Sequence, residues 1–88
     1  MSSREAIETD IRAIVSRAMD DEIAPEDLPL DVPVFSGGLG MDSMSGIELL
    51  SAIEERFGIY IDDDNFEIFD SLRQMIDFVE NSLEDSQG

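Results

Sequence analysis

The chain contains no cysteine, no histidine and no lysine. The absence of cysteine excludes disulfides, thiolate metal sites and cysteine nucleophiles. The absence of histidine excludes Ser-His-Asp catalysis and histidine-based zinc sites, and it removes the commonest general base. Because a serine without an adjacent base is a poor nucleophile, the composition argues against an autonomous enzyme. We therefore expect no catalytic residue and no metal site in this protein.

Basic side chains are few, and all five of them are arginines. With 22 acidic residues the formal net charge is −17, so the surface repels nucleic-acid phosphates and anionic membranes. The same charge attracts basic protein partners and speeds their approach, most strongly at low salt. We expect a protein that binds neither nucleic acid nor membrane and that docks against basic patches on other proteins.

Long hydrophobic runs are also absent, and none approaches the length of a membrane span. The N-terminus lacks the basic and then apolar layout of a signal peptide. Hydrophobic residues make up 42% of the chain, which is too much for a disordered acidic tail. We expect one small domain over residues 1–88, with a core over about 4–83 and a polar tail, 84–88, that frays. We also expect it to be discrete, cytoplasmic and monomeric.

The spacing of apolar residues predicts an all-α fold. Long amphipathic helices are expected over about residues 4–20, 43–57 and 72–83, and a short helix over about 64–69. Together these elements predict a small four-helix bundle, with three long helices and one short one. Residues 21–41 are expected to form a long loop between the first two long helices, because they contain three prolines and then three glycines.

Each long helix is expected to bury one apolar face. Two further apolar residues of the second helix, Met44 and Leu49, lie at the rim of its predicted face, and we expect Met44 to be exposed. The predicted buried residues are Ile7, Ile11, Ile14, Val15 and Ala18 on the first helix, Ile47, Leu50, Ile53 and Phe57 on the second, and Leu72, Met75, Ile76, Val79 and Leu83 on the last.

Asp42 and Ser43 stand where the long loop meets the second helix. Aspartate and serine are typical helix N-caps, so Ser43 is expected to be exposed beside the free backbone N–H groups of the first turn. One interpretation is that Ser43 is simply a helix cap. The other is that it is a site of covalent attachment, because a phosphodiester there would meet backbone donors and a favourable helix dipole.

Two other motifs fail on inspection. Gly38-Leu39-Gly40 begins like a dinucleotide-binding loop, but Ser43 occupies the third glycine position and no strand is expected before it. The acidic cluster that starts at Asp62 suggests a calcium loop, but its sixth residue is Glu67 where that loop requires glycine. Its twelfth residue is Arg73 where the loop requires glutamate. We expect neither a nucleotide site nor a calcium site.

The stretch Gly40-Met41-Asp42-Ser43-Met44, followed by Ile47-Glu48-Leu49-Leu50, resembles the attachment motif of acyl carrier proteins. In that family the serine after the aspartate carries a phosphopantetheine arm. The resemblance therefore implies attachment at Ser43, with Asp42 beside it. It covers roughly residues 4–83, and it departs from the family where a proline-containing turn usually precedes the short helix.

What the resemblance implies is a carrier and not an enzyme. A phosphopantetheinyl transferase would move the arm from coenzyme A to Ser43, and the terminal thiol of the arm would carry acyl groups as thioesters. Ketosynthases, acyltransferases or other acyl-processing enzymes would dock basic patches on the second helix. The residues implied for docking are Met44, Glu48, Glu54 and Glu55, and those that could line an acyl channel are Ile47, Leu50, Ile53, Ile61 and Ile76.

The resemblance leaves several functions open. The Asp-Ser pair in a discrete chain fits polyketide, other specialised-metabolite or fatty acid biosynthesis, and the absence of lysine favours a specialised pathway. A discrete peptidyl or aminoacyl carrier of a nonribosomal pathway is an alternative. A second alternative is an unmodified acidic helical adaptor that binds basic partners, with Ser43 only as a cap. The adaptor does not explain why three glycines precede the Asp-Ser pair.

Overall fold

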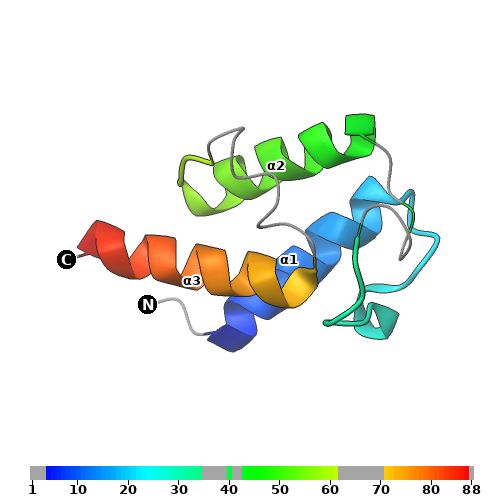
Figure 1. Cartoon of the computed structure of the whole chain (residues 1–88), viewed down its shortest axis with the longest axis horizontal. Helices are drawn as coiled ribbons and strands as arrows, with labels where there is room; N and C mark the ends of the chain where they lie inside the picture. Colours follow the sequence, from blue (N-terminus) through cyan, green and yellow to red (C-terminus); the bar gives the residue numbers. More distant parts are fainter. Residues whose placement is uncertain (1–3, 35–39, 41–42, 62–70, 88) are drawn as a thin grey trace.

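The computed structural model of the chain describes residues 4–34, 40, 43–61 and 71–87, although the side chains of residues 43 and 85–87 lie outside that description. All regular structure in these ranges is helical (Figure 1). It consists of α1 (Arg4–Ala18), the short 3-10 helix η1 (Pro25–Asp27), α2 (Ser43–Phe57) and α3 (Leu72–Gln87). The predicted all-α fold is confirmed, and the short helix predicted over 64–69 lies outside the described residues.

Helix α1 is the central element of the bundle. Both α2 and α3 pack against it, and η1 lies against it as well. Figure 1 shows α1 crossing α3 at an angle, with α2 above both helices in this view. None of the described helices is long and apolar enough to cross a membrane.

The hydrophobic core combines one stripe from each helix with apolar residues of the connecting segments. Burial of these side chains supplies the main driving force for folding. Two loop residues, Leu28 and Val34, join the core and so hold the long loop against the bundle. The buried set is Ile7, Ile11, Val15, Leu28, Val34, Leu49, Leu50, Ile53, Ile61, Leu72, Met75, Ile76 and Val79.

The buried face of α2 is rotated around the helix axis relative to the face that the sequence predicts. Ile47 was expected in the core, but this prediction is wrong because its side chain is 59% exposed. Leu49, expected at the rim, is completely buried. At 100° per residue Leu49 lies about 40° from the buried Ile53 around the helix, whereas Ile47 lies roughly 120° from it. The face that packs on the rest of the bundle is therefore centred near Ile53, and Ile47 falls outside it.

The ends of the helices agree with local capping rules. Gly58 follows α2 with φ +66°, and its N–H donates to the Glu54 carbonyl at 2.8 Å, as is typical of a glycine that ends a helix. Before α3 the Ser71 hydroxyl accepts the N–H of Gln74 at 3.4 Å. Helix α3 continues to Gln87, past its predicted end at Leu83. The predicted end near Leu83 is therefore too early, while the fraying predicted for residues 84–88 stays a prediction.

Arg12 fastens the long loop to α1. Its guanidinium donates to the carbonyl oxygens of Pro25 at 2.9 Å and Leu28 at 2.7 Å. It also pairs with Glu8 one turn earlier on the helix, with Nε and Oε2 2.8 Å apart. Together these contacts satisfy loop carbonyls that the packed segment removes from water.

A second fastening joins the loop to the start of α3. The backbone N–H of Arg73 donates to the Leu30 carbonyl at 3.1 Å. Its guanidinium donates to both carboxylate oxygens of Asp31, with Nη2 and Oδ2 3.0 Å apart. The hydrogen bond from Arg73 lowers the pKa of the Asp31 carboxyl, and the same bond raises the pKa of Arg73.

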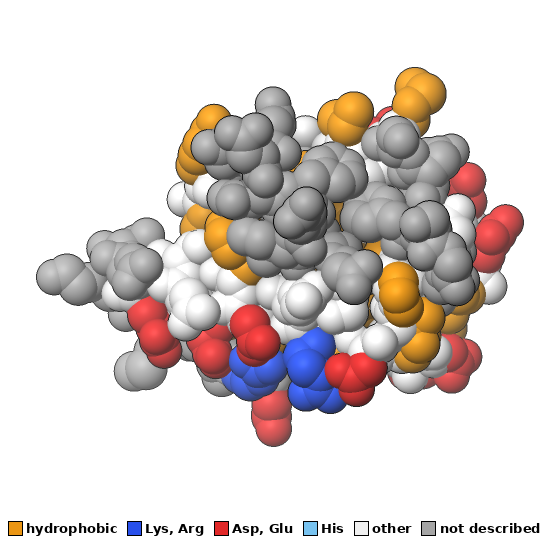
Figure 2. Space-filling view, viewed as in Figure 1, with side chains coloured by type: hydrophobic (Ala, Val, Ile, Leu, Met, Phe, Trp, Pro, Cys, Tyr) orange, Lys and Arg blue, Asp and Glu red, His pale blue; other side chains and the backbone are white. Residues whose placement is uncertain are grey.

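The remaining paired arginines join helices. Arg4 contacts Asp77 at 2.8 Å and Glu80 at 3.2 Å, which links α1 to α3. Arg56 on α2 lies 3.0 Å from Asp10 on α1. Figure 2 shows arginines flanked by acidic side chains along the lower edge of the molecule. Exposed pairs of this kind contribute little to stability, but they engage positive charge that partners would otherwise meet.

The orientation of α2 predicts a large loss of stability for a substitution at Leu49 and a small one at Ile47. Leu49→Ala should lower the free energy of unfolding by about 2–5 kcal/mol, because it removes a completely buried side chain. Ile47→Ala should change it by no more than about 0.5 kcal/mol, because Ile47 is largely exposed. Urea unfolding followed by circular dichroism measures both. Equal losses, or a larger loss for Ile47→Ala, would contradict the orientation described.

The contact of Asp31 with Arg73 predicts a change in titration. Arg73→Met should raise the pKa of Asp31 towards the ordinary aspartate value of about 3.9. Because the folded pKa is the lower one, the pair stabilises the fold above the ordinary pKa, and this contribution disappears as the pH falls through the lowered pKa. NMR titration of the Asp31 carboxyl measures the change, and Arg17→Met serves as the control. Identical Asp31 titrations in both variants would refute the pairing.

Candidate functional site at the start of helix α2

The structure begins α2 at Ser43, as the Asp-Ser pair predicts. The first N–H groups of a helix have no carbonyl partner within that helix, and they lie at the positive end of its dipole. Ser43 therefore occupies a helix N-terminus on a rigid element. Asp42 and the side chain of Ser43 lie outside the described residues, so their predicted contacts stay predictions.

Gly40 gives the approach to Ser43 its backbone shape. It is exposed and has φ +76°, a conformation that residues with a side chain rarely adopt. Among the described residues, no heavy atom lies within 4 Å of the position that a Cβ would take. The positive φ therefore favours glycine here whatever surrounds it.

The charge around the start of α2 suits an anion. The first turn of α2 carries no acidic side chain, although the chain has 22 acidic residues. Glu48 is the first acidic residue within the helix. A phosphate attached at Ser43 would meet the N–H donors and dipole of this turn, and the acidic residues nearest in sequence are Asp42, just before the helix, and Glu48. This part of the structure therefore fits a phosphate-bearing prosthetic group.

The outward face of α2 next to Ser43 combines apolar and acidic residues. Met44 is 77% exposed, as expected, and Ile47 lies one turn further along the same helix. Figure 2 shows hydrophobic side chains projecting at the upper edge, where α2 lies in Figure 1. We call this exposed face the outer strip, and it consists of Met44, Ile47, Glu48, Ser51 and Glu55.

The four predicted docking residues do not all lie on this strip. Met44, Glu48 and Glu55 belong to it, but Glu54 is only partly exposed. The Glu54 carboxylate Oε2 accepts the backbone N–H of Ile61 at 3.0 Å. The sequence gives no signal for this contact, because no spacing rule pairs a helix carboxylate with an N–H seven residues beyond it.

The residues predicted to line an acyl channel fall into a buried group and one exposed residue. Leu50, Ile53, Ile61 and Ile76 are all buried, with Leu50 the most exposed at 6%, and they belong to one core cluster. Ile47 lies outside that cluster on the exposed face. The structure therefore brings four of the five together as core, while their role as a channel lining stays a prediction.

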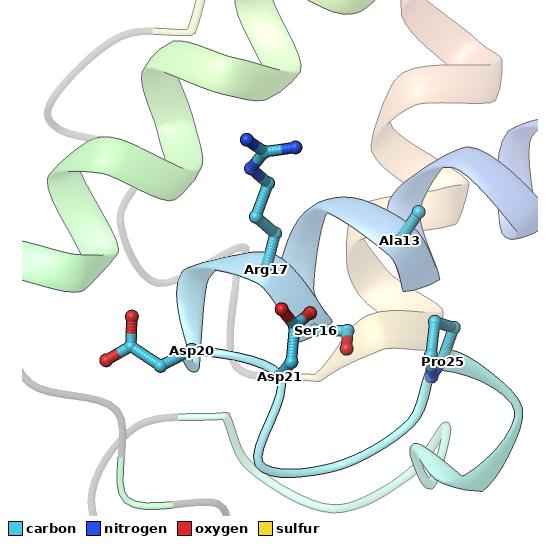
Figure 3. A pocket seen from close by; sticks show the side chains of 6 residues that line it. All are labelled: Ala13, Ser16, Arg17, Asp20, Asp21 and Pro25. Carbon is cyan, nitrogen blue, oxygen red and sulfur yellow. The ribbon is translucent and has the colours of Figure 1, made fainter.

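Two hollows lie near the C-terminal end of α1. The larger, of about 620 Å³, is lined by side chains that Figure 3 shows around the end of this helix. In it Arg17 extends towards α2, while Asp20 and Asp21 lie on the turn after α1. Ser16 is fully buried there, and its hydroxyl donates to the Ile23 carbonyl at 2.7 Å. This polar hollow arises from the way the loop leaves the helix.

The second hollow, of about 280 Å³, lies between α1 and α2. Arg17 and Glu48 are its charged residues, and its apolar walls come from Ile14, Ala18, Leu49 and Ala52. Within the described ranges no group of histidine, cysteine, aspartate or glutamate side chains is arranged to hold a metal ion. The acidic cluster that starts at Asp62, where no calcium site is expected, lies outside those ranges.

The sequence is similar to proteins of known type. Residues 9–79 match the family described as the phosphopantetheine attachment site. Acyl carrier protein 2 of Pseudomonas aeruginosa is 35% identical over 77 residues, which cover 88% of this chain and 94% of that protein. The acyl carrier protein of Cyanidium caldarium is 34% identical over 79 residues, which cover 90% of this chain and 88% of the relative. The acyl carrier protein of Thermosynechococcus vestitus is 30% identical over 86 residues, covering 94% and 98%.

The matched region includes most of α1, all of the long loop, all of α2 and the first half of α3. The all-helical architecture agrees with the bundle that the spacing of apolar residues predicts. Proteins of this kind hold acyl groups on phosphopantetheine and do not themselves catalyse reactions. The chain belongs to the acyl carrier protein family, as a phosphopantetheine-bearing carrier of acyl groups.

Proposed function

We propose that Ser43 is the residue that carries the phosphopantetheine arm. The main support is its place as the first residue of α2, in a helical turn without acidic side chains. None of the described residues crowds the position of a Cβ at Gly40, which supports access for an approaching enzyme. Asp42, immediately before the serine, belongs to the motif that resembles the family's attachment site.

The attachment reaction needs a second protein. The Ser43 hydroxyl oxygen would form a bond to the phosphorus of coenzyme A that bears the pantetheine, and the pyrophosphate bond would break to release 3′,5′-ADP. The hydroxyl proton would pass to a base of the phosphopantetheinyl transferase, since this chain has no histidine to accept it. Once bound, the arm supplies a terminal thiol that holds acyl groups as thioesters.

The rest of the chain presents this attachment point to partner enzymes. A flexible tether on a rigid helix makes the meeting of acyl group and enzyme nearly intramolecular. The outer strip offers the exposed Met44 next to the attachment point and carboxylates at Glu48 and Glu55. We propose that transferases, ketosynthases and acyltransferases dock here through apolar pockets with basic rims, in small, charge-steered and short-lived complexes.

We further propose that the acyl groups belong to polyketide, other specialised-metabolite or fatty acid biosynthesis. The similarity to proteins named acyl carrier proteins supports acyl groups over aminoacyl groups. A discrete peptidyl or aminoacyl carrier is the alternative in the same class, and the absence of lysine is our reason for favouring a specialised pathway. Loading assays with acyl- and aminoacyl-activating enzymes would separate these alternatives.

The attachment site has a direct test. Incubation of the chain with coenzyme A, magnesium and a broad-specificity phosphopantetheinyl transferase should add one phosphopantetheine to the intact mass. Ser43→Ala should gain nothing, because the accepting hydroxyl is gone. No gain by a parent chain that circular dichroism shows to be folded would sink this proposal, and it would leave the unmodified acidic adaptor in its place.

Docking on the outer strip predicts a graded loss of transferase efficiency. Met44→Ala should lower kcat/KM for the transferase roughly five-fold or more, because it removes an exposed apolar contact beside the reacting serine. Glu48→Gln should lower it about two- to five-fold at low salt, with the difference shrinking as salt screens the charge.

Glu26→Gln is the matched control for that experiment. Glu26 is an exposed carboxylate on η1, which packs against α1 and not on the outer strip. Its substitution changes the net charge as Glu48→Gln does, so it should leave kcat/KM nearly unchanged. Equal effects of the two glutamate substitutions would show that overall charge, and not the outer strip, governs docking.

A further inference from the structure

Glu54 holds the segment that follows α2 at three points. Its backbone carbonyl accepts the N–H groups of Gly58 at 2.8 Å and Ile59 at 3.3 Å. Its side-chain carboxylate accepts the N–H of Ile61 at 3.0 Å. Ile61 is only 3% exposed and belongs to the hydrophobic core. One residue therefore fixes residues 58–61 on the end of the helix and keeps Ile61 in the core.

Glu54 also lies at the far end of a line of residues that starts at Ser43. Ile47, Leu50 and Glu54 follow Ser43 by 4, 7 and 11 positions, a spacing that places all four on one side of an α-helix. Along this line the exposed fraction falls from 59% at Ile47 to 6% at Leu50. The line thus leads over roughly 16 Å from the helix N-terminus at the surface to the contact with Ile61.

The Glu54 carboxylate is open to competition. The side chain is partly exposed, and each carboxylate oxygen can accept more than one donor. A guanidinium group binds a carboxylate with two parallel N–H donors and uses both oxygens. An arginine of a docking partner would therefore compete with the Ile61 N–H for Oε2. Glu55, the next residue, is exposed and would bring such a partner close.

We propose that Glu54 couples the docking of an arginine-bearing partner to the release of residues 58–61 from the bundle. Pairing with the partner's guanidinium weakens the hold on the Ile61 N–H, so Ile61 loosens from the core at the inner end of the line from Ser43. Only one part of this rests on the proposed function, namely the effect that the release has on an arm at Ser43. The competition at Glu54 stands on the contacts alone.

Amide hydrogen exchange of Ile61, measured by NMR on the unloaded chain, tests the contact itself. Glu54→Ala should speed exchange of the Ile61 amide roughly ten-fold or more relative to the Val15 amide, because the charged acceptor is lost. Glu54→Gln keeps an acceptor oxygen and the shape of the side chain, so it should give a smaller increase. Glu55→Ala should give none. Ile61 protection that is unchanged in Glu54→Ala would overturn the proposal.

The competition is tested with a hexa-arginine peptide at fixed low ionic strength. The peptide should speed Ile61 exchange in the parent chain several-fold while leaving the Val15 amide unchanged. In Glu54→Gln, which has no charge to pair with the guanidinium, the peptide should have little effect. An equal acceleration in both proteins, or peptide binding without any change at Ile61, would refute the coupling.

Both measurements use the chain without an arm, so they separate two kinds of failure. A chain that gains no mass with coenzyme A and the transferase would overturn the proposed function and leave the competition at Glu54 standing. Unchanged Ile61 exchange in a chain that does gain the arm would overturn the coupling and leave the attachment site at Ser43 intact.

Discussion

Burial of the apolar stripe of α1 is the contact on which the rest of the structure depends. Ile7, Ile11 and Val15 are almost completely inaccessible, and both α2 and α3 pack on this helix. In a domain of 88 residues a single core is only just large enough to offset the loss of chain entropy. The position of α2, and of Ser43 at its start, therefore depends on the buried side chains of another helix.

The acidic surface works against that core and also serves the function. At a net charge of −17 the acidic side chains repel one another. Each described contact of an arginine with a carboxylate offsets part of this repulsion. Arg4, Arg12, Arg56 and Arg73 are all engaged in this way within the molecule. The carboxylates of the outer strip are available to basic partners, since no ion pair joins them to an arginine in the described part of the chain.

Much of the fold follows from local patterns in the sequence. The start of α2 at Ser43 and its end before Gly58 were predictable because capping chemistry acts within a few residues. The orientation of α2 was not, since Ile47 and Leu49 are both apolar and only the neighbouring helices decide which one is buried. Likewise, the carbonyls bound by Arg12 depend on the path of the loop, which no helical spacing reveals.

The candidate site shows the same division. Its motif predicted which serine begins the helix and that Met44 would be exposed, because these follow from residue type and position. The inward contact of Glu54 with Ile61 needed the structure, since it joins a helix to the segment beyond its end.

All of the positively charged side chains are arginines, and this affects how the charge of the protein responds to pH. Guanidinium groups stay charged at any pH at which proteins fold, and ordinary carboxyl groups lose their protons well below neutrality. With no histidine and no cysteine, the side chains offer no group whose reference pKa lies near pH 7. From mildly acidic conditions up to neutrality the charge of the side chains therefore changes little. In this range the attraction of basic partners depends mainly on ionic strength.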